Sequence, residues 1–270
     1  MTSKEEGVLV AADANQEWLL SWWWENYSRF NQYPVTFVDL GLTEQGRRWC
    51  DERGAWLAMP KCDLPIADKS QIDPGLVAEW EFFYGKTFWP KRPLFFLKPL
   101  ICLQTPYEKT LWLDLDCEVR CCVSEVFAYL QNPGFCISQD LTLSSTQQKT
   151  IYNGGVIGFS KRHPLLIEWS KRVFDQNAFF FSDQELLSHL IVEGITVLPS
   201  LYQWSHYFGD NAIARIVHWH GELGKKAIKL AMRKNGFSEE GSEDQCSQKH
   251  GRAAEDHRHV GMAAEERARG

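Results

Sequence analysis

The sequence lacks a long hydrophobic run and an excess of positive charge. Its longest apolar stretch, around Pro93 to Leu103, is interrupted by Lys98 and is shorter than the ~18–20 residues of a membrane-spanning helix. We therefore expect no transmembrane segment. The net charge of −6 leaves no overall basic surface for a phosphate backbone, which argues against nucleic acid as a partner. The first residues, Met1 to Glu6, include acids where a secretory signal has a basic start, so we expect a cytoplasmic protein.

Paired cysteine motifs are also absent, because none of the eight cysteines forms a C-x-x-C pair. Cys117, Cys121 and Cys122 lie close together, and we interpret them as reduced thiols of a cytoplasmic protein and not as part of a disulfide framework. A zinc site based on Cys121 and Cys122 is an alternative, although zinc sites usually use the C-x-x-C spacing.

Three common catalytic loop motifs are missing. The chain has no G-x-x-x-x-G-K-[ST], no G-x-G-x-x-G after its first apolar run and no G-x-S-x-G. The first cradles the phosphates of an NTPase, the second binds a dinucleotide and the third carries the nucleophile of an α/β-hydrolase. These absences argue against all three classes.

What the sequence does have is an alternation of short β-favouring runs with segments of helical periodicity. We expect strands at residues 8–12, 35–38, 55–59, 110–115, 155–159, 194–198 and 214–218, and helices at residues 18–27, 44–53, 94–104, 164–174 and 183–192. Strands that alternate with helices require crossover connections. The pattern therefore predicts an α/β fold with a mostly parallel central sheet flanked by helices.

The composition changes near Met232. Between Arg233 and Gly270 the large apolar residues are Phe237, Val260 and Met262, which is too few to bury enough surface to offset the entropy of an ordered chain. We therefore predict one folded domain over residues 1–232 and a disordered polar tail over residues 233–270.

Two aspartates end the strongest predicted strand, in the run Thr110-Leu-Trp-Leu-Asp-Leu-Asp116. Side chains alternate along a strand, so Asp114 and Asp116 should share one face. Ligands of open α/β sheets bind beyond the carboxyl ends of the strands. Carboxylate oxygens suit Mg²⁺ or Mn²⁺, and we expect a divalent metal site here. The alternative is the polar face of a half-exposed strand.

Two further segments combine polar residues with sharp turns or helix starts. Gly154 and Gly155 allow a ligand to approach the backbone, while Asn153 offers a donor and an acceptor; a plain tight turn is the alternative. Asp183 and Gln184 begin a predicted helix, where they can bind hydroxyl groups. Taken alone, the segment fits an ordinary helix cap better.

A histidine ends the last predicted strand. His218 stands at the carboxyl end of the run Arg215-Ile-Val-His218, where an imidazole can meet a metal or a phosphate. A satisfied polar residue at a strand end is the alternative, but the aspartate pair would supply ligands for the same ion.

Taken in chain order, these segments resemble the nucleotide-diphospho-sugar transferases of the GT-A fold, and within them glycosyltransferase family 8. The resemblance covers roughly Val8 to Lys226 and includes the first strand end, Ala11-Ala-Asp-Ala-Asn15. It implies a Rossmann-like GT-A fold. The family motif His-x-x-Gly-x-x-Lys is matched by His218 and Gly221, whereas the lysine, Lys225, stands one position late.

The resemblance assigns roles to particular residues. It implies donor binding by Ala11, Asp13, Asn15, Lys98, Asn153, Gly154, Gly155, Asp183, Gly221 and Lys225. It implies metal binding by Asp114, Asp116 and His218, and a catalytic set of Asp114, Asp116 and Gln184.

The expected function is therefore metal-dependent transfer of a hexose from a nucleotide-diphospho-sugar, with a UDP-sugar favoured, to a glycan, lipid or protein acceptor. The expected cofactor is Mn²⁺ or Mg²⁺, since a divalent cation stabilises the departing diphosphate. Retention of configuration follows from the resemblance. A sugar nucleotidyltransferase and a non-catalytic binder of sugar nucleotides or glycans are the alternatives.

Overall fold

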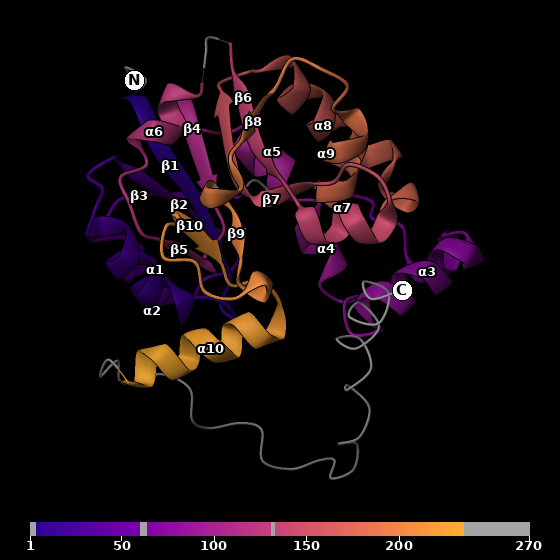
Figure 1. The fold of residues 1–270 in the computed structure, drawn as a ribbon, viewed down its shortest axis with the longest axis horizontal. Helices are drawn as coiled ribbons and strands as arrows, with labels where there is room; N and C mark the ends of the chain where they lie inside the picture. Colours follow the sequence, from indigo (N-terminus) through magenta and orange to yellow (C-terminus); the bar gives the residue numbers. More distant parts are fainter. Residues whose placement is uncertain (1–3, 60–63, 131–132, 235–270) are drawn as a thin grey trace. The chain divides into compact units, whose positions relative to one another are not determined.

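The computed structural model describes residues 4–59, 64–130 and 133–234, and the described residues from Lys4 to Met232 form one compact unit. Its centre is a seven-stranded sheet in the order β3-β2-β1-β4-β7-β6-β8 (Figure 1). The strands are β1 (Lys4–Ala12), β2 (Val35–Asp39), β3 (Ala55–Ala58), β4 (Tyr107–Leu113), β6 (Phe135–Gln139), β7 (Tyr152–Ser160) and β8 (Thr196–Leu198). Neighbouring strands are parallel except at β7, which is antiparallel to β4 and β6. The predicted mostly parallel α/β sheet is confirmed.

A second, three-stranded sheet is made of β5 (Cys117–Val119), β10 (Ile216–His218) and β9 (Trp204–Ser205). The helices are α1 (Leu19–Ser28), α2 (Glu44–Asp51), α3 (Pro74–Tyr84), α4 (Arg92–Phe95), α5 (Lys98–Cys102), α6 (Ser124–Ala128), α7 (Leu141–Gln147), α8 (Pro164–Asp175), α9 (Asp183–Leu190) and α10 (Gly221–Lys234). Short 3₁₀ turns are η1 (Lys69–Gln71), η2 (Asn177–Phe179), η3 (Ser200–Tyr202) and η4 (His206–Phe208).

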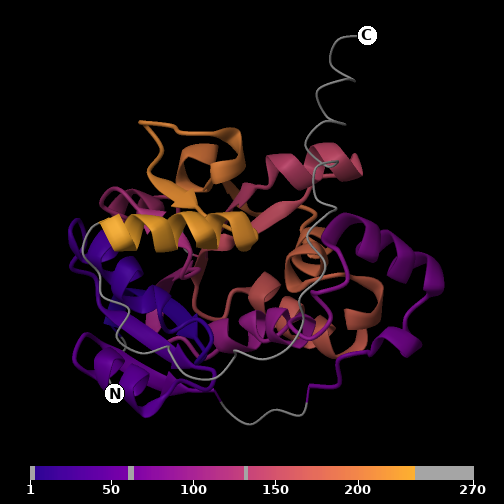
Figure 2. The ribbon, with the colours of Figure 1, turned by 90° about the horizontal axis from the view of Figure 1, so that it is seen from below.

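The inner strands of the central sheet are buried on both faces, which successive side chains of a strand point to in turn. On β1, Val8 and Val10 join a core with α1, α6 and the small sheet, whereas Leu9 joins a core with α5, α8 and α9. Figures 1 and 2 show these two layers of helices. The sheet is thus a rigid platform whose carboxyl edge can present polar residues.

Prolines divide the helix that the sequence predicts over residues 94–104. It is two short helices, α4 and α5, and a proline stands in the first turn of each: Pro93 in α4 and Pro99 in α5. Proline suits a helix start but disfavours helical backbone in the residue before it. The break therefore places Lys98 at the beginning of α5.

The last described helix, α10, extends through Lys234, so the first two residues of the predicted tail are helical. The rest of that predicted tail, from residue 235, lies outside the described residues. Among the residues that the structure describes, no helix combines the length and apolarity needed to cross a bilayer.

Candidate active site

The predicted metal-binding residues meet at the carboxyl edge of the central sheet, where β1 and β4 end. Because β7 is antiparallel to β4, its first residues lie at the same edge, and Leu113 of β4 is opposite Val156 of β7. The Asp114 amide continues this pairing by donating to the carbonyl of Gly155 at 2.9 Å. The edge therefore brings the aspartate segment beside the adjacent glycines.

Asp114 and Asp116 converge, but not as residues of a strand. β4 ends at Leu113, and the Cys117 amide donates to the Asp114 carbonyl at 3.0 Å, which closes a turn. The predicted extension of the strand to Leu115 is therefore wrong. The turn directs Oδ2 of Asp114 to 3.8 Å and Oδ1 of Asp116 to 3.0 Å from Nε2 of His218.

A lysine holds one oxygen of each aspartate. Nζ of Lys98 donates to Oδ1 of Asp114 at 3.0 Å, and Nζ of Lys225 donates to Oδ2 of Asp116 at 2.9 Å. Burial by itself would raise the pKa of Asp116, but His218 and Lys225 lower it well below its usual range, so this carboxylate stays ionised. The other oxygen of each aspartate faces the imidazole.

The His218 imidazole is oriented by a buried amide. Its Nδ1 contacts Nε2 of Gln203, while Oε1 of Gln203 is buried without a partner. If the amide is turned over, Oε1 accepts a hydrogen bond from Nδ1–H and the buried oxygen is satisfied. Nε2 points to Oδ1 of Asp116 at 3.0 Å, and a ring with its proton on Nδ1 would offer the Nε2 lone pair to a cation bound between them.

The donor set fits a hard divalent cation. Ligand atoms of Asp116, Cys117 and His218 lie within 4.8 Å of one another, and Oδ2 of Asp114 adds a second carboxylate. Burial raises the pKa of the Cys117 thiol well above its usual value, and its Sγ donates to the Gly155 carbonyl at 3.5 Å. A protonated thiol is a poor ligand, so the carboxylates and the imidazole match Mn²⁺ or Mg²⁺ better than a thiolate-bound ion.

Asp140 connects the other predicted binding residues, although the sequence analysis did not identify it. Its Oδ2 accepts from Nδ2 of Asn153 at 2.9 Å and from Nε2 of Gln184 at 3.4 Å. In turn, the Gly154 amide donates to Oε1 of Gln184 and the Gly155 amide to Oδ1 of Asn153. The network fixes the glycine backbone and both amide side chains beside the candidate metal ligands.

Asp183 has an unpartnered oxygen inside this network. The residue is 4% exposed, and its Oδ2 is buried without a hydrogen bond. Burial raises its pKa to about 6, although the nearby Lys98 ammonium lowers it. A buried polar atom without a partner is costly, and a hydroxyl group of a bound sugar would satisfy it.

Asp183→Asn should change how stability depends on pH. In the folded state the pKa of this carboxyl is raised from its ordinary value of 3.8 to about 6. The wild-type free energy of unfolding is therefore highest below this pH range and falls as the pH rises through it. Above it, the variant should gain about 2–3 kcal/mol in unfolding free energy, since one pKa unit corresponds to 1.36 kcal/mol. Urea unfolding at about pH 4 and about pH 7.5 measures both values.

Asp175→Asn is the control, because Asp175 is exposed and lies on α8, outside the candidate site. Its effect should be small at both pH values. An unchanged pH dependence in Asp183→Asn would contradict the assignment of the raised pKa to this carboxyl.

The predicted donor-binding residues Ala11, Asp13 and Asn15 lie where β1 ends, at the same edge. Ala11 belongs to β1, paired with Val38 of β2. Asp13 accepts from the Gln16 amide at 2.9 Å, and Nδ2 of Asn15 donates to Asp13 at 3.3 Å. These bonds shape the turn that follows β1.

Gly221 begins α10 and has a φ of +75°, which glycine adopts without strain. A Cβ atom there would lie 2.9 Å from the hydroxyl of Tyr207. Gly221 therefore has a structural role in the turn between β10 and α10, beside any contact with a ligand.

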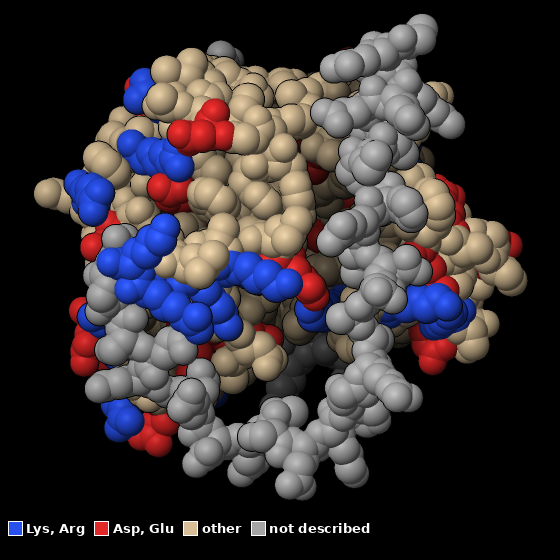
Figure 3. Space-filling view, turned by 60° about the horizontal axis from the view of Figure 1, so that its bottom comes forward, with Lys and Arg blue, Asp and Glu red and all other residues tan. Residues whose placement is uncertain are grey.

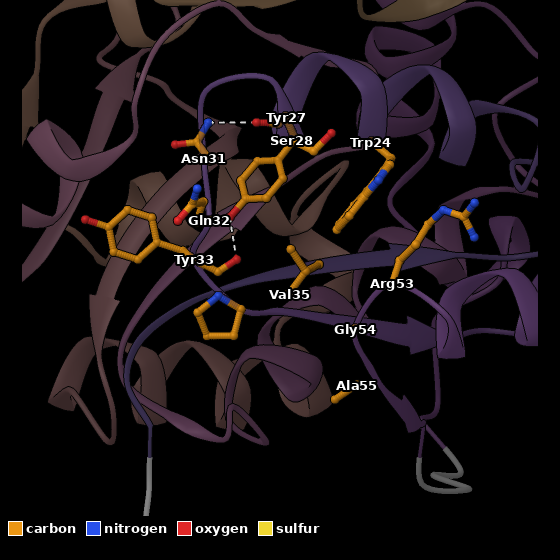
Figure 4. Close-up of a pocket in the computed structure, with 11 residues that line it drawn as sticks. Trp24, Tyr27, Ser28, Asn31, Gln32, Tyr33, Val35, Arg53, Gly54 and Ala55 are labelled. Atoms are coloured by element: carbon orange, nitrogen blue, oxygen red, sulfur yellow. Dashed lines mark hydrogen bonds between the residues drawn. The ribbon is translucent and has the colours of Figure 1, made fainter.

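A separate cavity of about 410 Å³ lies at the other end of the sheet (Figure 4). It is lined at the beginnings of β2 and β3 by residues that include Trp24, Tyr33 and Arg53. The Tyr27 hydroxyl donates to the Tyr33 carbonyl at its wall at 2.9 Å. Because ligands of such sheets bind at the carboxyl edge, this cavity does not belong to the candidate site.

Comparisons with solved structures identify the fold. The galactosyltransferase LgtC, in complex with donor and acceptor sugar analogs, is similar with a TM-score of 0.58 and 15% identity over 88% of this chain and 98% of that chain. The bifunctional glycosyltransferase WbbM gives a TM-score of 0.57 and 12% identity over 82% of this chain and 46% of that one. Mouse xyloside xylosyltransferase 1 gives a TM-score of 0.50 and 14% identity over 79% of this chain and 97% of that chain.

No model of a protein family matches the sequence, and no curated protein matches it. At the identities of the solved structures the likeness establishes the fold: the chain has the GT-A architecture of these proteins.

Proposed function

We propose that the chain is a cytoplasmic, metal-dependent glycosyltransferase whose catalytic domain covers residues 1–232. It moves a hexose from a nucleotide-diphospho-sugar, with a UDP-sugar favoured, to an acceptor. One observation carries the proposal: Asp114, Asp116 and His218 converge at the carboxyl edge of a GT-A sheet, and two lysines flank them. Such an edge is where ligands of open α/β sheets bind.

The charges suit departure of a nucleoside diphosphate. Asp114, Asp116 and His218 would hold Mn²⁺ or Mg²⁺, which when bound supplies Lewis-acid stabilisation of the leaving oxygens. Lys98 and Lys225 place two ammonium groups beside these ligands, and we expect them to assist in binding the diphosphate.

The sugar would lie against the network of Asp140, Asn153 and Gln184. Asp183, with its unpartnered oxygen, would accept a hydrogen bond from a sugar hydroxyl. Gln184 carries an amide, which is no base, so we propose that the departing phosphate takes the proton of the acceptor hydroxyl. This corresponds to retention of configuration at the anomeric carbon.

A thermal-shift panel of UDP-, GDP- and CMP-sugars, each with and without Mn²⁺, tests the proposal. A ligand that binds only the folded state adds about 2.7 kcal/mol at a hundredfold excess over Kd, which is about 5–10 °C for a domain of this size. We expect this shift with a UDP-sugar and Mn²⁺ together. The Asp116→Asn variant should not show it.

Product analysis of the same samples separates an enzyme from a binding protein. Release of UDP and free sugar in the stabilised sample indicates an enzyme, whereas a shift without turnover, with every acceptor offered, indicates a binding protein. No shift with any sugar nucleotide would overturn the donor class.

A further inference from the structure

The exposed side of α10 has a composition that the candidate site does not explain. The helix contains five basic residues and one acidic residue. One side is fixed to the protein: Ile228 is buried in the main core, and a Cβ on Gly224 would lie 2.0 Å from the Trp219 carbonyl oxygen. The helix is therefore packed closely by its inner face, and its outer face has a defined direction.

The outer face carries two leucines and two lysines. Leu223 and Leu230 are 61% and 57% exposed, and Lys226 and Lys229 are exposed between them. Residues three, four and seven positions apart share a helix face, so these four form one stripe, which we call the α10 stripe. In Figure 3 blue side chains gather over this helix.

The α10 stripe is positive in a protein whose net charge is −6. A nucleic acid would pair with the lysines and leave both leucines in water. A bilayer surface with anionic headgroups uses both kinds of residue, because lysines pair with the headgroups while leucines enter the boundary with the acyl chains.

We propose that the α10 stripe docks the protein on a membrane that contains anionic lipid. The adjacent Lys225 holds Asp116 of the candidate metal site, so a helix lying on the bilayer keeps that site near the surface. If the proposed transferase function holds, the acceptor is a lipid-linked molecule, from among the glycan, lipid and protein acceptors that the sequence allows.

Co-sedimentation of the full chain with phosphatidylcholine vesicles, with and without phosphatidylglycerol, tests the docking. Wild type should bind the anionic vesicles and release at high salt, since salt screens surface charge. Lys226→Glu/Lys229→Glu should weaken the vesicle partition constant at least about 25-fold, because each lysine near the surface contributes about fivefold. Leu223→Gln/Leu230→Gln keeps the charge and should weaken it at least about tenfold.

Lys91→Glu/Lys171→Glu is the matched control: it changes the net charge equally at exposed lysines outside α10, and its binding should stay close to wild type. Equal binding by the α10 charge variant and this control would overturn the proposal. A second result would also overturn it: the wild type binds DNA but not anionic vesicles, and the leucine changes do not affect the DNA binding.

The membrane proposal and the transferase proposal fail separately. Vesicle binding needs no donor, and donor hydrolysis in solution needs no vesicle. Lys226→Glu/Lys229→Glu should retain hydrolysis of a soluble donor, and circular dichroism should show unchanged helix content.

Discussion

Asp116→Asn should remove Mn²⁺-dependent transfer or hydrolysis of a sugar nucleotide, by at least about 10³-fold in kcat/KM. Asp116 supplies one oxygen toward Nε2 of His218 and the other to Nζ of Lys225. An amide cannot supply a charged oxygen to a divalent cation and leaves Lys225 without its counterion. Kinetics with saturating Mn²⁺ and a UDP-sugar measure the loss, and circular dichroism tests that the fold is kept.

A second aspartate serves as the control for this change. Asp73 caps α3 by accepting from the Gly75 amide at 2.8 Å. It is not one of the candidate metal ligands. Asparagine caps helices about as well as aspartate, so Asp73→Asn should keep full activity. If Asp116→Asn also retained activity within about tenfold of wild type, the metal-assisted chemistry would be wrong.

Gly155→Ala should disturb the candidate metal site although it removes no ligand. A Cβ at this position would lie 2.5 Å from Cε1 and 2.6 Å from Nδ1 of His218, and 3.0 Å from Nε2 of Gln203. The ring is buried between these groups, so it cannot move away freely. We expect a loss of about 1–3 kcal/mol in unfolding free energy and of about 10–100-fold in Mn²⁺ affinity.

The neighbouring glycine provides a matched comparison. A Cβ on Gly154 would meet Nζ of Lys98 at 3.3 Å, a contact that a small shift of the ammonium group relieves. Gly154→Ala should therefore cost under about 1 kcal/mol. Chemical unfolding and titration with Mn²⁺ compare the two variants; similar losses in both would contradict a role for the close approach to His218.

The sequence predicts the sheet edge well because polar residues that follow apolar strands are visible without a structure. Asp114, Asp116 and His218 meet although 102 positions separate Asp116 from His218. The predicted alternation of side chains along a strand is nevertheless wrong here, since the aspartates stand in a turn. Both a strand and this turn bring the two carboxylates together, so their predicted convergence does not depend on the strand.

Asp140 and Gln203 could not be found in the same way. Asp140 follows β6, a short strand between β7 and β8, and its partners Asn153 and Gln184 come from later segments. An aspartate after an apolar run was the available clue. Gln203 precedes β9, a strand of two residues, and only the tertiary structure brings it to His218.

The paired lysines of the candidate site have a thermodynamic consequence. Lys98 and Lys225 neutralise Asp114 and Asp116 in the structure described, so the acidic pair is held in place before any ion arrives. In the proposed metal-bound state the carboxylates would turn to the cation, and the two ammonium groups would be free to bind a diphosphate. Each ligand then lowers the cost of accepting the other, and linkage requires this cooperativity to be equal in both directions.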